Sequence, residues 1–309
     1  MSEESTMKTT KTIRQRPGLR PLTLACLGIL VSLGALNLPA RADNDGAQAK
    51  APANLPKIRA PHDSALPPGP QGDQIRYGRR LLTETKRLLP DHVGDALNCT
   101  SCHLAGGKTP KGSPFVGVAH RYPAYNPRAG RVVTLEERIN GCFLRSMNGS
   151  KVPPESKEMQ AMVAYMNWLS KDTPANGKVQ GGGVGKINKD LLPDPVNGKR
   201  VYDAQCAVCH GQNGEGVKNA RGEYVFPPLW GKDSFNVGAG MARTYTAAAF
   251  VKNNMPIGHG LNAPLGQGGV LNDQEAVDVA EYFSHQPRPD FPAKVNDWPK
   301  GGKPKDARY

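Results

Sequence analysis

Apolar residues along the chain form several distinct patterns, and the first of them predicts a targeting segment. Leu22 to Leu38 is an apolar run of 17 residues, rich in Leu, Ala and Gly, preceded by a polar, basic stretch and followed by an Ala-x-Ala sequence that ends at Ala42. This order is typical of a Sec-type signal peptide. We therefore predict cleavage after Ala42 and a periplasmic mature chain without a membrane span. An uncleaved anchor is the alternative, because such a run is at the short limit for a span.

Helical periodicity appears farther along the chain. The spacing of apolar residues predicts helices over residues 76–89, 135–147 and 157–169. Near the end, Asn272 is followed three residues later by Glu275, a capping box that predicts a last helix ending before Pro287. Between these regions, residues 176–190 are rich in glycine and lysine and have no apolar period. That composition predicts a linker between two domains.

Two copies of Cys-x-x-Cys-His stand at a separation typical of domains. The first copy begins at Cys99 and the second at Cys206. In this motif the thiols form thioethers with haem and the adjacent histidine supplies an axial nitrogen to the iron. The alternative, a bare zinc or redox Cys-x-x-Cys, needs neither the histidine nor the repetition. We therefore predict two covalently bound c-type haems, attached through Cys99, Cys102, His103, Cys206, Cys209 and His210.

The surroundings of the two motifs repeat one another. The segments that begin at Gly78 and Gly198 are similar, but the first lies about thirteen residues farther from its motif, which predicts an insertion there. The expected fold is mainly α, with two tandem class I cytochrome c-like domains that each enclose one haem. The predicted parts are a signal peptide (1–42), a first domain with an N-terminal extension (43–175), a linker (176–190), a second domain (191–292) and a C-terminal tail (293–309).

Composition and charge fit haem-filled domains and narrow the choice of partner. Hydrophobic residues make up 38% of the chain, whereas Gly and Pro number 35 and 28; a covalently held haem fills a small core and acts as a staple. The net charge is +13, and without residues 1–42 it is 34 − 25 = +9. Because the basic residues are spread along the chain and no nucleic-acid motif occurs, we expect an acidic protein or a small anion as partner, and no nucleic acid.

The distal ligand of the second haem is predicted from a Met-Pro pair. Met255 lies 45 residues after His210 and before the last helix. This placement resembles the methionine loop of class I cytochromes c. His/Met ligation raises the reduction potential of a haem, which suits a haem through which electrons leave. Lys252 and His259 are nearby alternative ligands, and a merely structural Met255 is a further alternative.

The first half has no such loop, and Cys142 stands at a comparable place, 39 residues after His103. Haem attachment would use four of the five cysteines of the mature chain, so Cys142 has no intramolecular disulfide partner. In a helix, Arg138 and Ser146 share its face, and a nearby cation favours the thiolate that binds metal and attacks sulfur. A buried inert thiol is the alternative, and Met147 is the competing distal ligand.

The segment from Arg138 to Gly149, Arg-Ile-Asn-Gly-Cys-Phe-Leu-Arg-Ser-Met-Asn-Gly, lies between the two haem motifs. It joins a thiol, a hydroxyl and guanidinium groups, and planar guanidinium groups suit a small sulfur oxyanion. With the two motifs, this segment makes residues 70–290 resemble the di-haem thiosulfate dehydrogenases, periplasmic cytochromes that interconvert thiosulfate and tetrathionate.

The resemblance implies a division of labour between the two haems. By it, His103 and Cys142 ligate a catalytic haem, while His210 and Met255 ligate a haem that passes electrons to a cytochrome c-type acceptor. The anion-binding residues that it implies are Arg128, Arg138, Arg145 and Ser146. Some members of the family have lysine immediately before the distal methionine, and here Asn254 takes that place.

The implied reaction converts two thiosulfate ions into tetrathionate and two electrons, and the reverse reaction, tetrathionate reduction, is also open. We expect Cys142 to take part directly, through a covalent Cys142–thiosulfate adduct that a second thiosulfate attacks. Two other functions remain open. One is a passive di-haem electron carrier with His/Met ligation at both haems. The other is a sulfur-oxidising cytochrome subunit that loads thiosulfate onto a carrier protein.

Overall fold

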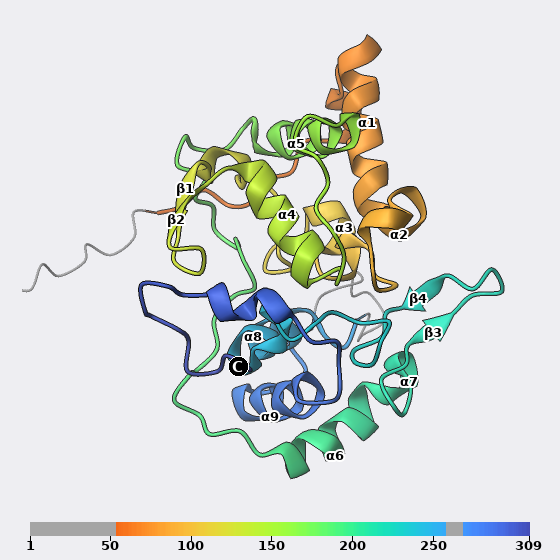
Figure 1. The fold of residues 1–309 in the computed structure, drawn as a ribbon, viewed down its shortest axis with the longest axis vertical. Coiled ribbons are helices and arrows are strands. Elements are labelled where there is room, and N and C mark those ends of the chain that lie inside the picture. Colours follow the sequence, from red (N-terminus) through yellow and green to blue (C-terminus); the bar gives the residue numbers. More distant parts are fainter. Residues whose placement is uncertain (1–53, 258–267) are drawn as a thin grey trace, which may run out of the picture. The chain divides into compact units, whose positions relative to one another are not determined.

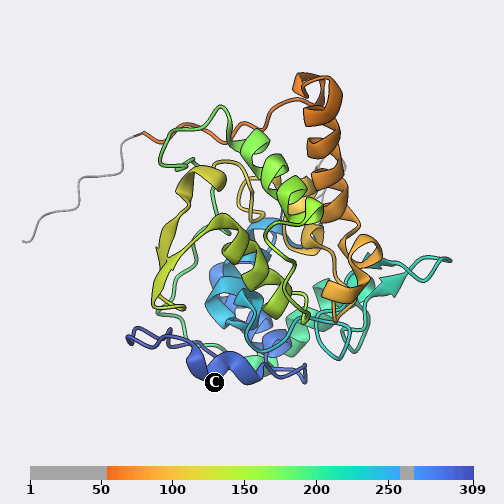
Figure 2. The same ribbon diagram turned by 45° about the horizontal axis from the view of Figure 1, so that its top comes forward.

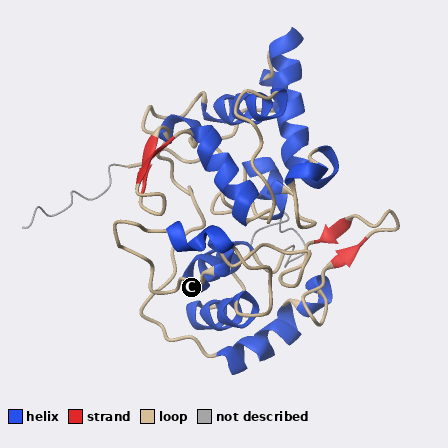
Figure 3. Cartoon of the chain, in the orientation of Figure 1, coloured by secondary structure: helices blue, strands red, loops and turns tan. Residues whose placement is uncertain are grey.

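The computed structural model describes residues 54–257 and 268–309. The predicted signal peptide, and His259 with it, lie outside these residues. The part from Ala51 to Tyr309 is one compact unit, and its described residues are mainly helical, with two short two-stranded sheets (Figures 1 and 3). The predicted fold class is therefore confirmed. No helix within the described ranges is both long and apolar enough to cross a membrane.

The first half is built on the crossing of α1 (Gly69–Thr83) and α5 (Lys157–Ser170), which Figure 2 shows clearly. The helices meet closely at Gly78, where a Cβ atom would overlap the carbonyl oxygen of Ala161. α1 begins before the predicted residue 76 and ends at Thr83, and the short α2 (Thr85–Leu88) follows it. The prediction of a single helix over 76–89 is therefore wrong, although the apolar side chains of this segment are largely buried as expected.

The break after α1 has a physical reason. The side chain of Thr85 is fully buried, and its Oγ1 accepts a hydrogen bond from the backbone N–H of Cys99 at 3.0 Å. This bond ties the end of α1 to the start of the first haem motif. The remaining elements of this half are η1 (Asp63–Ala65), η2 (Pro90–His92), η3 (Cys99–Ser101), α3 (Leu104–Gly107), η4 (Ala119–Arg121), the antiparallel strands β1 (Ala124–Asn126) and β2 (Arg131–Val133), and α4 (Leu135–Arg145).

The second half repeats the helix crossing with α6 (Pro195–Gln205) and α9 (Asp273–Ser284). A Cβ atom at Gly198 would overlap the carbonyl oxygen of Asp278, just as one at Gly78 would overlap that of Ala161. α9 begins at the predicted capping box, in which the backbone N–H of Glu275 donates to Asn272 at 3.0 Å. The other elements are α7 (Ala207–His210), β3 (Val217–Lys218), β4 (Tyr224–Phe226), η5 (Gly240–Ala242), α8 (Thr244–Asn254) and η6 (Pro292–Asn296).

The glycine-rich stretch and the C-terminal tail both pack against the first half. In the glycine-rich stretch, the carbonyl of Gly181 accepts a hydrogen bond from the backbone of Lys111 at 2.6 Å. In the C-terminal tail, the carboxylate of Asp297 accepts hydrogen bonds from Arg145 and Tyr309, both at 2.6 Å. One cluster of buried apolar side chains includes members of both halves. The linker stretch and the tail are thus packed parts of the fold.

Candidate haem and active sites

Both motif histidines are oriented by a backbone carbonyl group. The Nδ1 atom of His103 lies 2.6 Å from the carbonyl oxygen of Ser113, and that of His210 lies 2.8 Å from the carbonyl oxygen of Pro227. A hydrogen bond from Nδ1–H leaves Nε2 as the nitrogen with a free lone pair, which is the form that ligates a metal. His103 is fixed further by stacking on Phe115, with ring centroids 4.1 Å apart. The loop after each motif therefore presets its histidine as a ligand.

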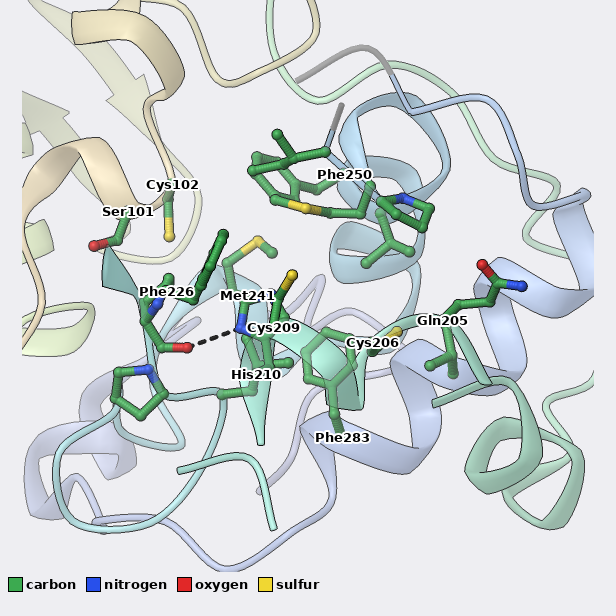
Figure 4. Close-up of a pocket in the computed structure, with 18 of the residues that line it drawn as sticks. Ser101, Cys102, Gln205, Cys206, Cys209, His210, Phe226, Met241, Phe250 and Phe283 are labelled. Atoms are coloured by element: carbon green, nitrogen blue, oxygen red, sulfur yellow. Dashed lines mark hydrogen bonds between the residues drawn. The ribbon is translucent and has the colours of Figure 1, made fainter. Parts of the chain in front are cut away.

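Each motif faces a cavity of its own. The first cavity has a volume of about 290 Å³ and the second about 340 Å³. Figure 4 shows the second, with Cys206, Cys209 and His210 among its lining residues. The donors and the mostly apolar linings fit a c-type haem in each cavity: two unpaired thiols for thioethers and an oriented imidazole. Leu97 and Cys102 line both cavities, so the two haem sites adjoin.

The position of Cys142 is set by α4. This helix begins at a capping box in which the backbone N–H of Thr134 donates to the Glu137 carboxylate at 3.0 Å. In its middle, the amide of buried Asn140 makes both possible hydrogen bonds with the backbone of Val152, at 2.8 and 2.9 Å. The helix is thereby held firmly in the first half. Its predicted end at residue 147 is slightly too late, because Ser146 caps it.

Cys142 faces His103 in the first cavity. Burial by itself raises the pKa of the Cys142 thiol, but the charge of Arg138 and the hydrogen bonds from His103 and Arg138 outweigh it and lower the pKa to about 6. The Nη1 atom of Arg138 donates to the sulfur of Cys142 at 2.9 Å. By contrast, burial raises the pKa of Cys99 and of Cys102 to about 12. Cys142 is thus a thiolate at neutral pH, the form that binds metal and attacks sulfur.

The four anion-binding residues implied by the resemblance fall into two groups. Arg138 and Ser146 line the first cavity together with Cys142. Arg128 and Arg145 lie outside that lining, where both face the carboxylate of Asp297, at 3.6 and 2.6 Å. The Asp297 side chain is only 4% exposed, so the two arginines are bound to the C-terminal tail.

Sequence reasoning missed Arg121 and Tyr122, which line the first cavity beside Arg138. The pKa of Arg138 is raised, chiefly by Cys142, and a hydrogen bond with Tyr122 adds to the effect. Arg121 is the last residue of η4 and Tyr122 follows it, in a part of the sequence without an apolar period. An arginine next to a tyrosine was its only signal in the sequence.

In the second cavity, Met255 lies in the lining, as does Met241, which the sequence did not suggest. Figure 4 shows Met241 in the same cavity as Cys209 and His210. Lys252, the alternative ligand, is outside the lining and pairs with Asp273. These positions favour a thioether as the sixth ligand here.

Comparison with known proteins places each half in a family. Residues 93–175 match the SoxA/TsdA cytochrome c domain, and residues 195–286 match cytochrome c. A thiosulfate dehydrogenase of Psychrobacter arcticus is 48% identical over 82% of this chain and 75% of its own length. A thiosulfate dehydrogenase of Allochromatium vinosum is 43% identical over 78% of this chain and 87% of its own.

The chain belongs to the thiosulfate dehydrogenase family. A solved structure of a thiosulfate dehydrogenase (TsdBA) from Marichromatium purpuratum agrees with the fold, with a TM-score of 0.65 and 38% identity over 74% of this chain. This chain spans about half of that longer one, since the match covers 49% of it. The expectations of an enzyme of this family and of two cytochrome c domains, which imply c-type haem, are confirmed.

Proposed function

We propose that this protein oxidises two thiosulfate ions to tetrathionate in the periplasm and passes the two electrons to a cytochrome c-type acceptor. The same site would run in reverse as a tetrathionate reductase. The observation that carries the proposal is the pair of Cys142 and Arg138, 2.9 Å apart, facing His103 in a cytochrome c cavity. The relatives named thiosulfate dehydrogenase support the choice of substrate.

The residues present would hold both haems. Cys99 and Cys102 would attach the first haem, and His103 and Cys142 would bind its iron. Cys206 and Cys209 would attach the second, and His210 and Met255 would bind its iron. When bound, each haem takes up one of the two electrons that the reaction releases, and the ligand sets tune the two potentials differently.

The chemistry of the thiol balances in two steps. In the first, the Cys142 thiolate forms a bond to the outer sulfur of thiosulfate: RS⁻ + S₂O₃²⁻ → RS–S–SO₃⁻ + 2 e⁻. In the second, another thiosulfate attacks the outer sulfur of this adduct. The bond from Cys142 to that sulfur breaks, tetrathionate leaves, and the thiolate is regenerated.

Arg138 and Ser146 have the task of making this encounter possible. A thiolate and a dianion repel each other, and two unit charges 4 Å apart cost about 4 kcal/mol at an effective dielectric constant of 20. The Arg138 guanidinium, in contact with the sulfur, offsets that repulsion at the reacting atom. The Ser146 hydroxyl, one helical turn farther along, is placed to donate to a sulfonate oxygen.

The test is Cys142→Gly, with Met147→Leu as its matched control in the same cavity. We expect Cys142→Gly to abolish turnover of thiosulfate while two haems per chain remain attached. Met147→Leu should keep near-normal activity if Cys142 is the ligand of the first haem. A large loss in Met147→Leu would indicate that Met147 is the ligand instead. Near-normal activity of Cys142→Gly would refute the proposal.

Addition of thiosulfate to the oxidised protein separates the two alternatives. A dehydrogenase is reduced by thiosulfate alone, which absorbance spectroscopy detects. A passive electron carrier would stay oxidised. A thiosulfate-loading subunit would need a carrier protein with a cysteine before any sulfur is transferred.

A further inference from the structure

We propose that Arg121 is a further anion-binding residue of the first cavity, and that it holds a sulfonate group of thiosulfate or tetrathionate beside Arg138. This inference rests on the proposed function and names a residue that the resemblance does not include. It is carried by the lining of the cavity, by the packing of the Arg121 side chain and by the bond that already joins Arg138 to Cys142.

Arg121 and Arg138 are the two arginines of the lining, which contains no carboxylate side chain among the described residues. The Arg138 guanidinium is already engaged, because it donates to the Cys142 sulfur at 2.9 Å. A dianion that enters the cavity therefore needs a second cation. Within the part of the chain that the structure describes, the Arg121 guanidinium forms no hydrogen bond or ion pair, so it is available for this role.

The backbone under Arg121 is anchored to the end of α5 and to the residues that follow it. The backbone N–H of Ala119 lies 3.3 Å from the hydroxyl of Ser170, and the His120 ring lies 3.2 Å from the carbonyl oxygen of Pro174. These bonds fix the η4 turn from which the side chain projects. The arginine therefore does not have to order its backbone when it binds an anion.

The stem of the Arg121 side chain is also held. It passes over Gly177, where a Cβ atom would lie 2.6 Å from the Cγ atom of Arg121. The same Cβ atom would overlap the carbonyl oxygen of Gly117. The stem thus packs against Gly177, while the residue as a whole is exposed and lines the cavity, an arrangement that long basic side chains commonly adopt.

The contrast with Arg128 and Arg145 strengthens the assignment. Both of those guanidinium groups already face the buried carboxylate of Asp297. To bind a substrate anion they would first have to leave that carboxylate uncompensated, which is costly in a buried place. Arg121 has no such bond to give up.

The experiment compares Arg121→Gln with Arg121→Lys and with Arg131→Gln in the complete holoprotein. Arg131 is the matched control. It is an exposed arginine of β2, pairs with Glu137 of α4 at 2.7 Å and lies outside the cavity lining. For Arg121→Gln we expect the KM for thiosulfate to rise by about tenfold to a hundredfold, the loss of one charge-assisted hydrogen bond. Its kcat should stay within about threefold. Arg121→Lys should recover part of the loss, and Arg131→Gln should behave as the parent protein.

A readout without turnover completes the test. Calorimetric titration of the oxidised protein with tetrathionate should show a similar rise in Kd for Arg121→Gln, with the potential of each haem unchanged. An unchanged KM and Kd would overturn the inference. So would a shifted haem potential with unchanged KM, because Arg121 would then bind a haem carboxylate. If the parent protein binds tetrathionate but thiosulfate never reduces it, the proposed function fails while the Arg121 site still stands.

Discussion

The two halves of the molecule are alike on one side of the haem cavity and differ on the opposite side. On the shared side, Gly78 and Gly198 let the first and last helices of each half meet, and a carbonyl oxygen orients each motif histidine. On the opposite side, the first cavity presents Cys142 and Arg138, whereas the second presents Met255 among apolar side chains.

The contrast between the two cavities lies in the distal segment. In each half, the helix crossing and the loop after the motif present the thiols and the oriented histidine that fit a c-type haem. Under the proposed function the distal segment decides how each haem is used. A thiolate beside a guanidinium would attract sulfur anions, whereas a thioether among apolar side chains would raise the potential.

Arg138→Met should make the first cavity resemble the second. Without the guanidinium, the Cys142 thiolate loses its hydrogen bond and the entering dianion meets an uncompensated charge. We expect kcat/KM for thiosulfate to fall by about a thousandfold, roughly 4 kcal/mol. Steady-state turnover with a cytochrome c acceptor measures it. Arg138→Lys should be intermediate, and a loss below tenfold for Arg138→Met would contradict the role assigned to this arginine.

Gly78→Ala and Gly198→Ala should disrupt the shared side equally. In each variant the new Cβ overlaps a backbone carbonyl oxygen of the crossing helix, which can move only if the helices separate. We expect each change to lower the free energy of unfolding by about 3 kcal/mol. Denaturation followed by haem absorbance measures it. Gly141→Ala, in a helix where a Cβ meets nothing within 4 Å, is the control and should be neutral or stabilising. Unequal losses at the two sites would show that the crossings are not equivalent.

Asp95 lies in the insertion that only the first half carries, and it makes stability depend on pH. Burial raises the pKa of its carboxyl group to about 7, and hydrogen bonding to Leu97 and the charge of Lys86 only partly oppose this. A carboxyl whose pKa is raised in the folded state is stabilising while protonated, so stability falls as pH rises from about 4 through 7.

Asp95→Asn should remove the loss of stability that accompanies the rise in pH. Between pH 5 and pH 8, the parent protein should lose about 2 kcal/mol more unfolding free energy than the variant, measured by guanidinium denaturation. Asp91→Asn, at an exposed position of the same insertion, should leave the pH dependence as it is. Equal pH dependence of the parent protein and Asp95→Asn would mean that the carboxyl titrates normally.

The smallest effect concerns the choice between two methionines in the second cavity. Met255→Leu should lower the potential of the second haem by at least about 59 mV, a tenfold change for a one-electron couple. Met241→Leu should change it much less. Potentiometric titration with spectroscopic detection measures the potential of the second haem in both variants. The reverse ranking would assign the distal ligand to Met241.

Local spacing allowed much of this protein to be inferred from sequence. Each haem-attachment motif is only five residues long and ends in its histidine, His103 or His210. Its chemistry can therefore be recognised without knowledge of the fold. The pairing of Arg138 with Cys142 also follows from the sequence, because residues four apart on a helix are neighbours wherever the helix packs. The same reasoning correctly placed the capping box that begins α9.

Contacts between distant residues were decided by the tertiary structure alone. Arg145 meets Asp297 across 152 positions of sequence, and no periodicity announces such a pair. Arg121 reaches the cavity because the chain after α5 folds back over its stem at Gly177. A guanidinium group looks the same in the sequence whether a carboxylate has neutralised it or not. Which arginines are free to bind an anion therefore depends on how the chain packs, and only the folded protein reveals it.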